Sequence, residues 1–86
     1  MSARSEKILQ GMRNSTANWT RDDLDTLYLG FGFIIRTGAK HDIVKHPKYP
    51  HLRATVPKKH RYLAIGYVTY AVKLVDELKS LQVKGD

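Results

Sequence analysis

The sequence predicts one small α+β domain, in which a three-stranded antiparallel sheet has helices on one face. The length of 86 residues allows one modest core and no second one. The hydrophobic pattern alternates over residues 31–56 and has helical spacing on either side. Prolines and turn-type residues divide the alternating part into short strands. Because helices on one face of such a sheet are an economical packing, residues 1–86 are expected to form a single domain, with a helical extension over 1–16 and a core over 18–81.

Three helices are expected from apolar spacing and end signals. Residues 5–13 carry apolar side chains at helical spacing, and the polar run that follows breaks this short helix. A second helix begins after Thr20, which can cap it together with Asp23 in an approximate capping box, and it ends at Gly30. The last helix covers residues 65–81. The side chains expected to face the core from these helices are Ile8, Leu9, Met12, Leu24, Leu27, Tyr28, Ile65, Val68, Val72, Val75 and Leu78.

Three strands are expected between the second and the last helix. They cover residues 31–36, 41–46 and 52–56, with a hairpin turn around Gly38 and a stop at Pro57. The inward side chains are expected to be Phe31, Phe33, Ile35, Leu52, Ala54 and Val56. The resulting order, α-α-β-β-β-α, contains an α-β-β-β-α core that resembles the arrangement of double-stranded-RNA-binding domains.

The excess positive charge of the chain is confined to residues 36–61. This segment holds eight Lys or Arg against the single acid Asp42, whereas the rest of the chain has seven charges of each sign. All the histidines lie in the same segment, and they are His41, His46, His51 and His60. Such segregation favours a surface for polyanions with a titratable group among the cations. The partners it indicates are nucleic acid or an acidic protein.

Several other classes of protein are not favoured. The chain has no cysteine, which excludes disulfides and thiolate metal sites and fits a reducing cytosol. It shows no apolar signal segment, no run of about 20 apolar residues and no lipidation signal, so neither export nor membrane association is expected. His41 and His46 are five residues apart on one strand and point to opposite faces, so no metal site is expected and no cofactor is predicted.

His41 is the candidate for chemistry on RNA. It follows the turn around Gly38 at the start of a strand, and Lys40 stands beside it. RNA carries its own nucleophile, the 2′-hydroxyl, so cleavage needs a base, cations for the charged phosphorane and a proton for the leaving oxygen. A histidine side chain, which in free peptides titrates near neutral pH, can be the base without any metal. Asp42 is expected to face away from His41 and not to orient it. From composition alone, a surface histidine without a role is the simpler interpretation.

Cations of the same segment are the candidates for phosphate binding, although a merely solvated surface is the alternative. Arg36 shares a strand with two adjacent apolar residues, so its face is ambiguous. Tyr62, Tyr67 and Tyr70 can stack on bases, but core packing is the better interpretation for at least one of them. The predicted RNA-binding residues are Arg36, Lys40, Lys45, Lys58, Lys59 and Arg61.

Three short runs occur in a characteristic order along the chain. They are Gly32 to His41, Ile43 to Pro47, and Thr55 to Pro57 followed by His60. Together they are similar to the G-F/W-x-x-x-R-x-x-G-S-H-H run, the short apolar strand and the T-V-P-x-H element of HicA-type toxins from bacterial HicA–HicB toxin–antitoxin modules. The similarity covers about Ser5 to Leu78, most of the chain.

The resemblance implies an mRNA-cleaving toxin of the bacterial cytoplasm with a double-stranded-RNA-binding-like fold. It implies one catalytic histidine, which falls on His41, and an acidic HicB-type antitoxin that covers the site and provides the only link to DNA. The sequence departs from the family pattern at Ala39, Lys40 and Asp42, where the family usually has Gly, Ser and a second His. Two alternatives stay open: a non-catalytic RNA-binding module of the same fold, and a subunit whose basic face matches an acidic protein.

Overall fold

The structure is a computed structural model that describes residues 3–58 and 62–85. The described residues form helices and strands in the order α-α-β-β-β-α, with an antiparallel sheet, which confirms the predicted fold class. The elements are α1 (Ala3–Asn14), α2 (Arg21–Gly30), β1 (Ile34–Arg36), β2 (His41–Lys45), β3 (Arg53–Pro57) and α3 (Ile65–Gly85).

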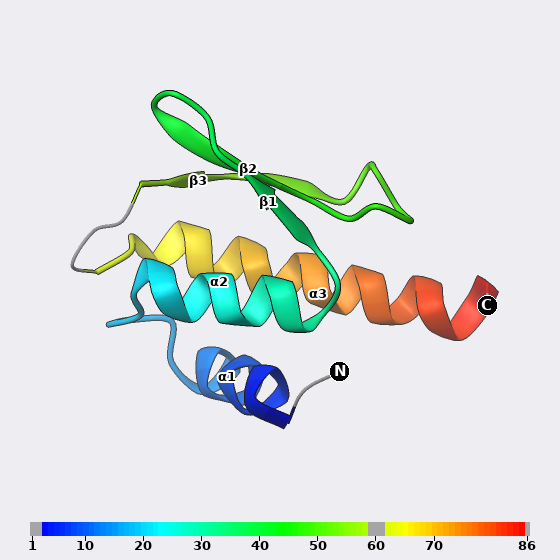
Figure 1. The fold of residues 1–86 in the computed structure, drawn as a ribbon. Helices are drawn as coiled ribbons and strands as arrows, with labels where there is room; N and C mark the ends of the chain where they lie inside the picture. The colour runs from blue at the N-terminus through cyan, green and yellow to red at the C-terminus, as the bar shows by residue number, and fades with distance from the viewer. Residues whose placement is uncertain (1–2, 59–61, 86) are drawn as a thin grey trace.

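The elements stack in three layers (Figure 1). The sheet has the strand order β1-β2-β3, and both neighbouring pairs are antiparallel. Helices α2 and α3 lie beneath one face of the sheet, and α1 packs on them from the far side. Leu9 and Met12 of α1 are fully buried, so the N-terminal helix contributes to the same core as the rest of the chain. The opposite face of the sheet carries no helix of the described chain (Figure 1).

The start of α2 is set by the capping box that its sequence predicts. The Thr20 side chain accepts a hydrogen bond from the Asp23 N–H, and the Asp23 carboxylate accepts one from the Thr20 N–H. These two bonds satisfy N–H groups that have no partner inside the helix. Leu24 follows on the inner side of the helix and is fully buried. The helix ends at Gly30, also as predicted.

The first strand begins later than the alternating pattern predicts, at Ile34 rather than at residue 31. The N–H groups of Phe31 and Phe33 return to carbonyl groups of the last turn of α2. Between them Gly32 has a φ of 89°, a left-handed conformation that glycine adopts without strain. Phe31 is therefore buried from a turn and not from a strand.

The core-facing stripe of α3 differs from the prediction at its start. The stripe runs through Val68, Val75 and Leu78, as expected, but Ile65 is 55% exposed, so its prediction as a core residue was wrong. Ile65 is the first helical residue and precedes the turns that pack on the sheet and α2. The helix also continues to Gly85 instead of stopping at residue 81.

The three tyrosines around the start of α3 are not core residues, contrary to the preferred interpretation for at least one of them. Tyr62 is 56% and Tyr70 44% exposed, and Tyr67 is half-buried outside the core cluster. The aromatic rings near this end of the helix are therefore accessible.

Candidate functional site

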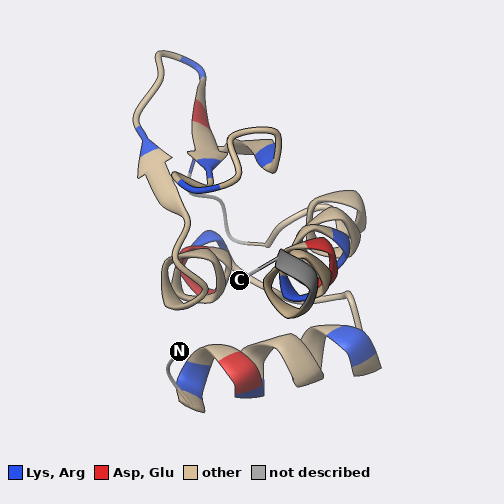
Figure 2. Ribbon diagram, turned by 90° about the vertical axis from the view of Figure 1, so that its right-hand side faces the viewer, with Lys and Arg blue, Asp and Glu red and all other residues tan. Residues whose placement is uncertain are grey.

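The side chains of the strands that point away from α2 and α3 form what we call the open face. Arg36 pairs directly with Ile43 across β1 and β2, and this register settles that Arg36 lies on the open face. The open face consists of Ile34, Arg36, His41, Ile43, Lys45, Arg53 and Thr55. Lys and Arg recur along the sheet and its loops, whereas the helices carry both signs of charge (Figure 2). The fold thus turns the charge segregation of the sequence into a basic surface.

His41 is the first residue of β2 and is exposed, opposite Pro57 of β3. Lys40, immediately before it, is exposed in the turn. The turn requires glycine at position 38, because a Cβ on Gly38 would lie 2.2 Å from the carbonyl oxygen of His41. The close approach of Gly38 to His41 therefore holds the backbone of the candidate histidine against the turn that precedes it.

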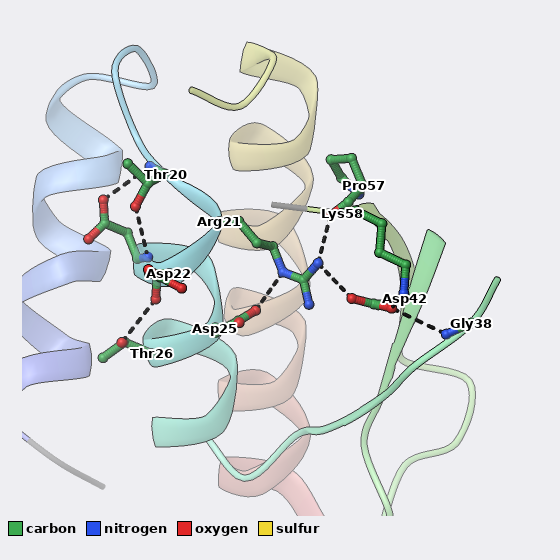
Figure 3. Close-up of polar contacts among 10 residues, drawn as sticks. Thr20, Arg21, Asp22, Asp25, Thr26, Gly38, Asp42, Pro57 and Lys58 are labelled. Carbon is green, nitrogen blue, oxygen red and sulfur yellow. Dashed lines mark hydrogen bonds and ion pairs between the residues drawn. The ribbon is translucent and has the colours of Figure 1, made fainter. Parts of the chain in front are cut away.

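Asp42 lies on the opposite side of β2 from His41, as the alternation predicts, and is 7% exposed. Its Oδ1 accepts from the Gly38 N–H at 3.2 Å and from Lys58 Nζ at 2.5 Å, and its Oδ2 lies 2.8 Å from Arg21 Nη1 (Figure 3). The hydrogen bond from Lys58, followed by that from Arg21, lowers the pKa of Asp42 to about 2. Asp42 thereby ties the turn before His41 to the end of β3 and to α2.

Arg21 completes this buried network and was not predicted as a site residue. Its Nε donates to Asp25 at 2.7 Å, and its Nη1 donates to the Pro57 carbonyl at 2.6 Å as well as to Asp42 (Figure 3). Burial alone would lower the pKa of Arg21, but the hydrogen bonds to Asp25 and Asp42 outweigh it and raise that pKa. The sequence offered one indication that Arg21 has a specific role. A cation in the first turn of a helix is unfavourable beside the positive end of the helix dipole, so it needs a specific acidic partner.

Lys45 and Arg53 are neighbours of like charge on the open face, directly opposite each other on β2 and β3. The His46 N–H bonds to the Leu52 carbonyl one step along the ladder, so Lys45 and Arg53 occupy a non-hydrogen-bonded pair, in which Cα atoms are about 4.5 Å apart. Like charges in this position destabilise a sheet. A bound anion would relieve the repulsion, so this part of the open face suits a phosphate.

Whereas His41 is exposed, His46 is buried and packed against other side chains. It is 7% exposed, its ring packs edge-on against Phe33 with centroids 5.0 Å apart, and its Nδ1 accepts from the Lys48 N–H at 3.1 Å. Burial lowers the pKa of His46 and outweighs the opposing effect of its hydrogen bond with the Phe31 backbone. In the described ranges, no three His, Cys, Asp or Glu side chains are grouped as metal ligands would be.

The remaining predicted cations have different surroundings. Lys58 directs its ammonium group to Asp42 while its side chain stays 41% exposed, so its contact with RNA stays a prediction. Lys59 and Arg61 lie outside the described residues. Arg53 was not among the predicted RNA-binding residues, although its alternation with the inward Ala54 could have placed it on the outward face of its strand.

Comparisons of the chain with protein-family models, with curated proteins and with solved structures find no match. None of the helices, as far as the described residues extend, combines the length and the apolar character that a membrane crossing needs.

Proposed function

We propose that this chain is a metal-independent endoribonuclease of the HicA toxin type, with His41 as its catalytic residue. The observation that carries the proposal is an exposed histidine at the start of the central strand, on a cation-bearing sheet face that no described helix covers. Arg36, Lys45 and Arg53 share that face, and Lys40 precedes His41 in the turn. An RNA strand lying across the open face meets the imidazole and several cations together.

The chemistry uses the nucleophile of the RNA itself. His41 removes the proton from a 2′-hydroxyl, and the resulting oxygen attacks the adjacent phosphorus. The bond from phosphorus to the 5′-oxygen breaks, and the 5′-oxygen takes up a proton from water. His41 then releases its extra proton to solvent, and the products are a 2′,3′-cyclic phosphate and a 5′-hydroxyl. Lys40 and Arg36 stabilise the charge of the phosphorane, while Lys45 and Arg53 bind flanking phosphates. Lys58, Lys59 and Arg61 are assigned to positioning of the RNA.

The test is gel-resolved cleavage of a long, end-labelled mRNA by purified protein, without ribosomes and with EDTA. His41→Ala is expected to abolish cleavage and to leave folding intact, because the side chain is exposed. His51→Ala is the matched control, because it removes another exposed imidazole, from the loop that follows the far end of β2. Cleavage that persists in His41→Ala would refute the assignment.

A non-catalytic RNA-binding module is the second candidate, and the surroundings of Asp42 favour it. Both carboxylate oxygens of Asp42 are engaged by other groups, so the acid next to His41 in the sequence does not orient the imidazole. This candidate predicts RNA binding with intact RNA in the cleavage assay. Binding is measured against salt concentration: Lys45→Ala should reduce the slope by about one, whereas Lys7→Ala, on α1 away from the sheet, should not.

An acidic antitoxin of the HicB type and a location in the bacterial cytoplasm are part of the same proposal. The formal charge of +7 and the open basic face are complementary to such a protein. If the chain is instead only the binding partner of an acidic protein, its affinity for RNA should be weak and should vanish at high salt.

A further inference from the structure

A groove lies between the free edge of β3 and the start of α3, and of its lining residues the proposed chemistry uses only Arg53. Its volume of about 520 Å³ is within the range of small-molecule pockets. The residues that matter for its chemistry are Arg53, Thr55, Ala64, Gly66, Tyr67 and Tyr70. Accessible tyrosine rings beside a strand edge combine flat apolar surface with backbone hydrogen-bonding groups.

The direction of the β3 backbone groups follows from the register. The His46 N–H bonds to the Leu52 carbonyl, and in an antiparallel ladder every second residue bonds to the same neighbour. Arg53, Thr55 and Pro57 are the residues between those positions. They therefore direct their backbone groups away from β2, toward the free edge and the groove.

Two of these three edge residues are already engaged. The Arg53 carbonyl accepts from the Tyr70 hydroxyl at 3.0 Å. The Pro57 carbonyl accepts from Arg21, and proline has no N–H to donate. Thr55, between them, directs both an N–H and a carbonyl group to this edge. An added peptide strand needs a longer run of such groups, so the edge suits a flat group with one donor and one acceptor better than a peptide.

The groove is continuous with the open face, because Arg53 and Thr55 belong to both. Charge at this junction is positive, since Arg53 lies beside Lys45. We propose that the groove binds one unpaired nucleobase of a single-stranded RNA that lies on the open face. The base stacks on Tyr67 or Tyr70, and its edge meets the backbone groups of Thr55. The inference rests on the proposed RNA substrate and adds a base-binding site to it.

Gly66 allows the groove to be filled without removing any existing contact. A Cβ placed on Gly66 meets no atom within 4 Å, and glycine is a poor helix former at this position of α3. Gly66→Leu and Gly66→Ala are therefore both expected to fold and to melt no lower than the wild type. The leucine side chain is expected to occupy the groove, because Gly66 lines it, and the alanine variant is the matched control for the change in backbone.

The probe is a set of short 2′-O-methyl RNA oligonucleotides, each with a single 2-aminopurine whose fluorescence falls when it stacks. Such RNA cannot be cleaved because its nucleophile is blocked, so binding is measured independently of His41. Wild type and Gly66→Ala are expected to quench one position and to bind equally. Gly66→Leu should lose the quenching and bind about tenfold more weakly, since stacking of one base contributes roughly 5- to 150-fold in affinity.

The outcomes separate this inference from the proposed nuclease. Equal affinity and quenching with Gly66→Leu would overturn the base site and leave the nuclease proposal intact. If Gly66→Leu binds more weakly and the wild type does not cleave mRNA, the base site is supported and the nuclease proposal is refuted. Occupation of the groove by a Glu-rich peptide that the RNA does not displace would overturn the inference in favour of a protein partner.

Discussion

Replacing Arg21 by Met should destabilise the domain strongly, because Arg21 joins α2 to two strands of the sheet. Its guanidinium contacts Asp25 at 2.7 Å, Asp42 at 2.8 Å and the Pro57 carbonyl at 2.6 Å. Methionine keeps an unbranched apolar stem and a good helix propensity, so the variant removes mainly the charge and these bonds. Asp42 is then left with the Lys58 ammonium as its remaining cation.

The expected magnitude follows from burial. Removal of one partner from a buried ion pair costs about 3–5 kcal/mol, and the remaining contact with Lys58 places Arg21→Met at the lower end, about 3 kcal/mol. A chain of 86 residues has a total stability of roughly 4–13 kcal/mol. At this size each kcal/mol shifts Tm by about 4–8 °C, so Tm should fall by more than about 10 °C.

The assay is urea unfolding followed by circular dichroism, with Arg13→Met as the matched control. Arg13 also contacts both carboxylate oxygens of an aspartate, Asp76, but this pair is exposed and its loss should cost less than about 1 kcal/mol. The two variants therefore remove the same kind of Arg–Asp pair, once from a buried position and once from an exposed one. A cost for Arg21→Met no greater than that for Arg13→Met would refute the reasoning.

Three further predictions concern single side chains. Asp42→Asn should flatten the loss of stability in acid: the pKa of Asp42 is about 2 in the folded chain against an ordinary 3.8, so its contribution is full above about pH 4 and is lost as the pH falls toward 2. Parallel curves of unfolding free energy against pH for the two proteins would contradict this. Tyr28→Phe should leave the free energy of unfolding unchanged or raise it by about 1 kcal/mol, because the hydroxyl is buried without a hydrogen-bond partner in the described chain and the ring keeps its contact with Phe33; a lower Tm would show that the hydroxyl is bonded. Lys45→Thr should raise the free energy of unfolding by about 0.5 kcal/mol by ending its repulsion with Arg53; urea unfolding tests this, and a loss of stability would show that the pair is not repulsive.

Spacing between near neighbours was enough to predict which elements form and the faces of most of their side chains. Thr20 and Asp23 are three residues apart, and their reciprocal hydrogen bonds start α2 as predicted. Alternation along β2 predicted that His41 and Asp42 face opposite sides of the sheet, as the structure confirms. These relations depend on the local backbone, which a sequence pattern describes directly. Spacing failed at Ile65, which shares the helical spacing of the core residues of α3. At this first residue of the helix no other part of the described core covers the side chain, so it is exposed.

Contacts between distant segments were decided only by the tertiary structure. Arg21 meets Asp42 and Pro57 because α2 docks at one end of the sheet, and no local pattern encodes that docking. The groove likewise exists only where the edge of β3 meets α3. By itself, then, the sequence determined which elements form and that the positive charge lies in one segment, because both depend on composition and spacing. Which acid is neutralised inside, and where the groove forms, depended on how elements far apart in the chain pack together.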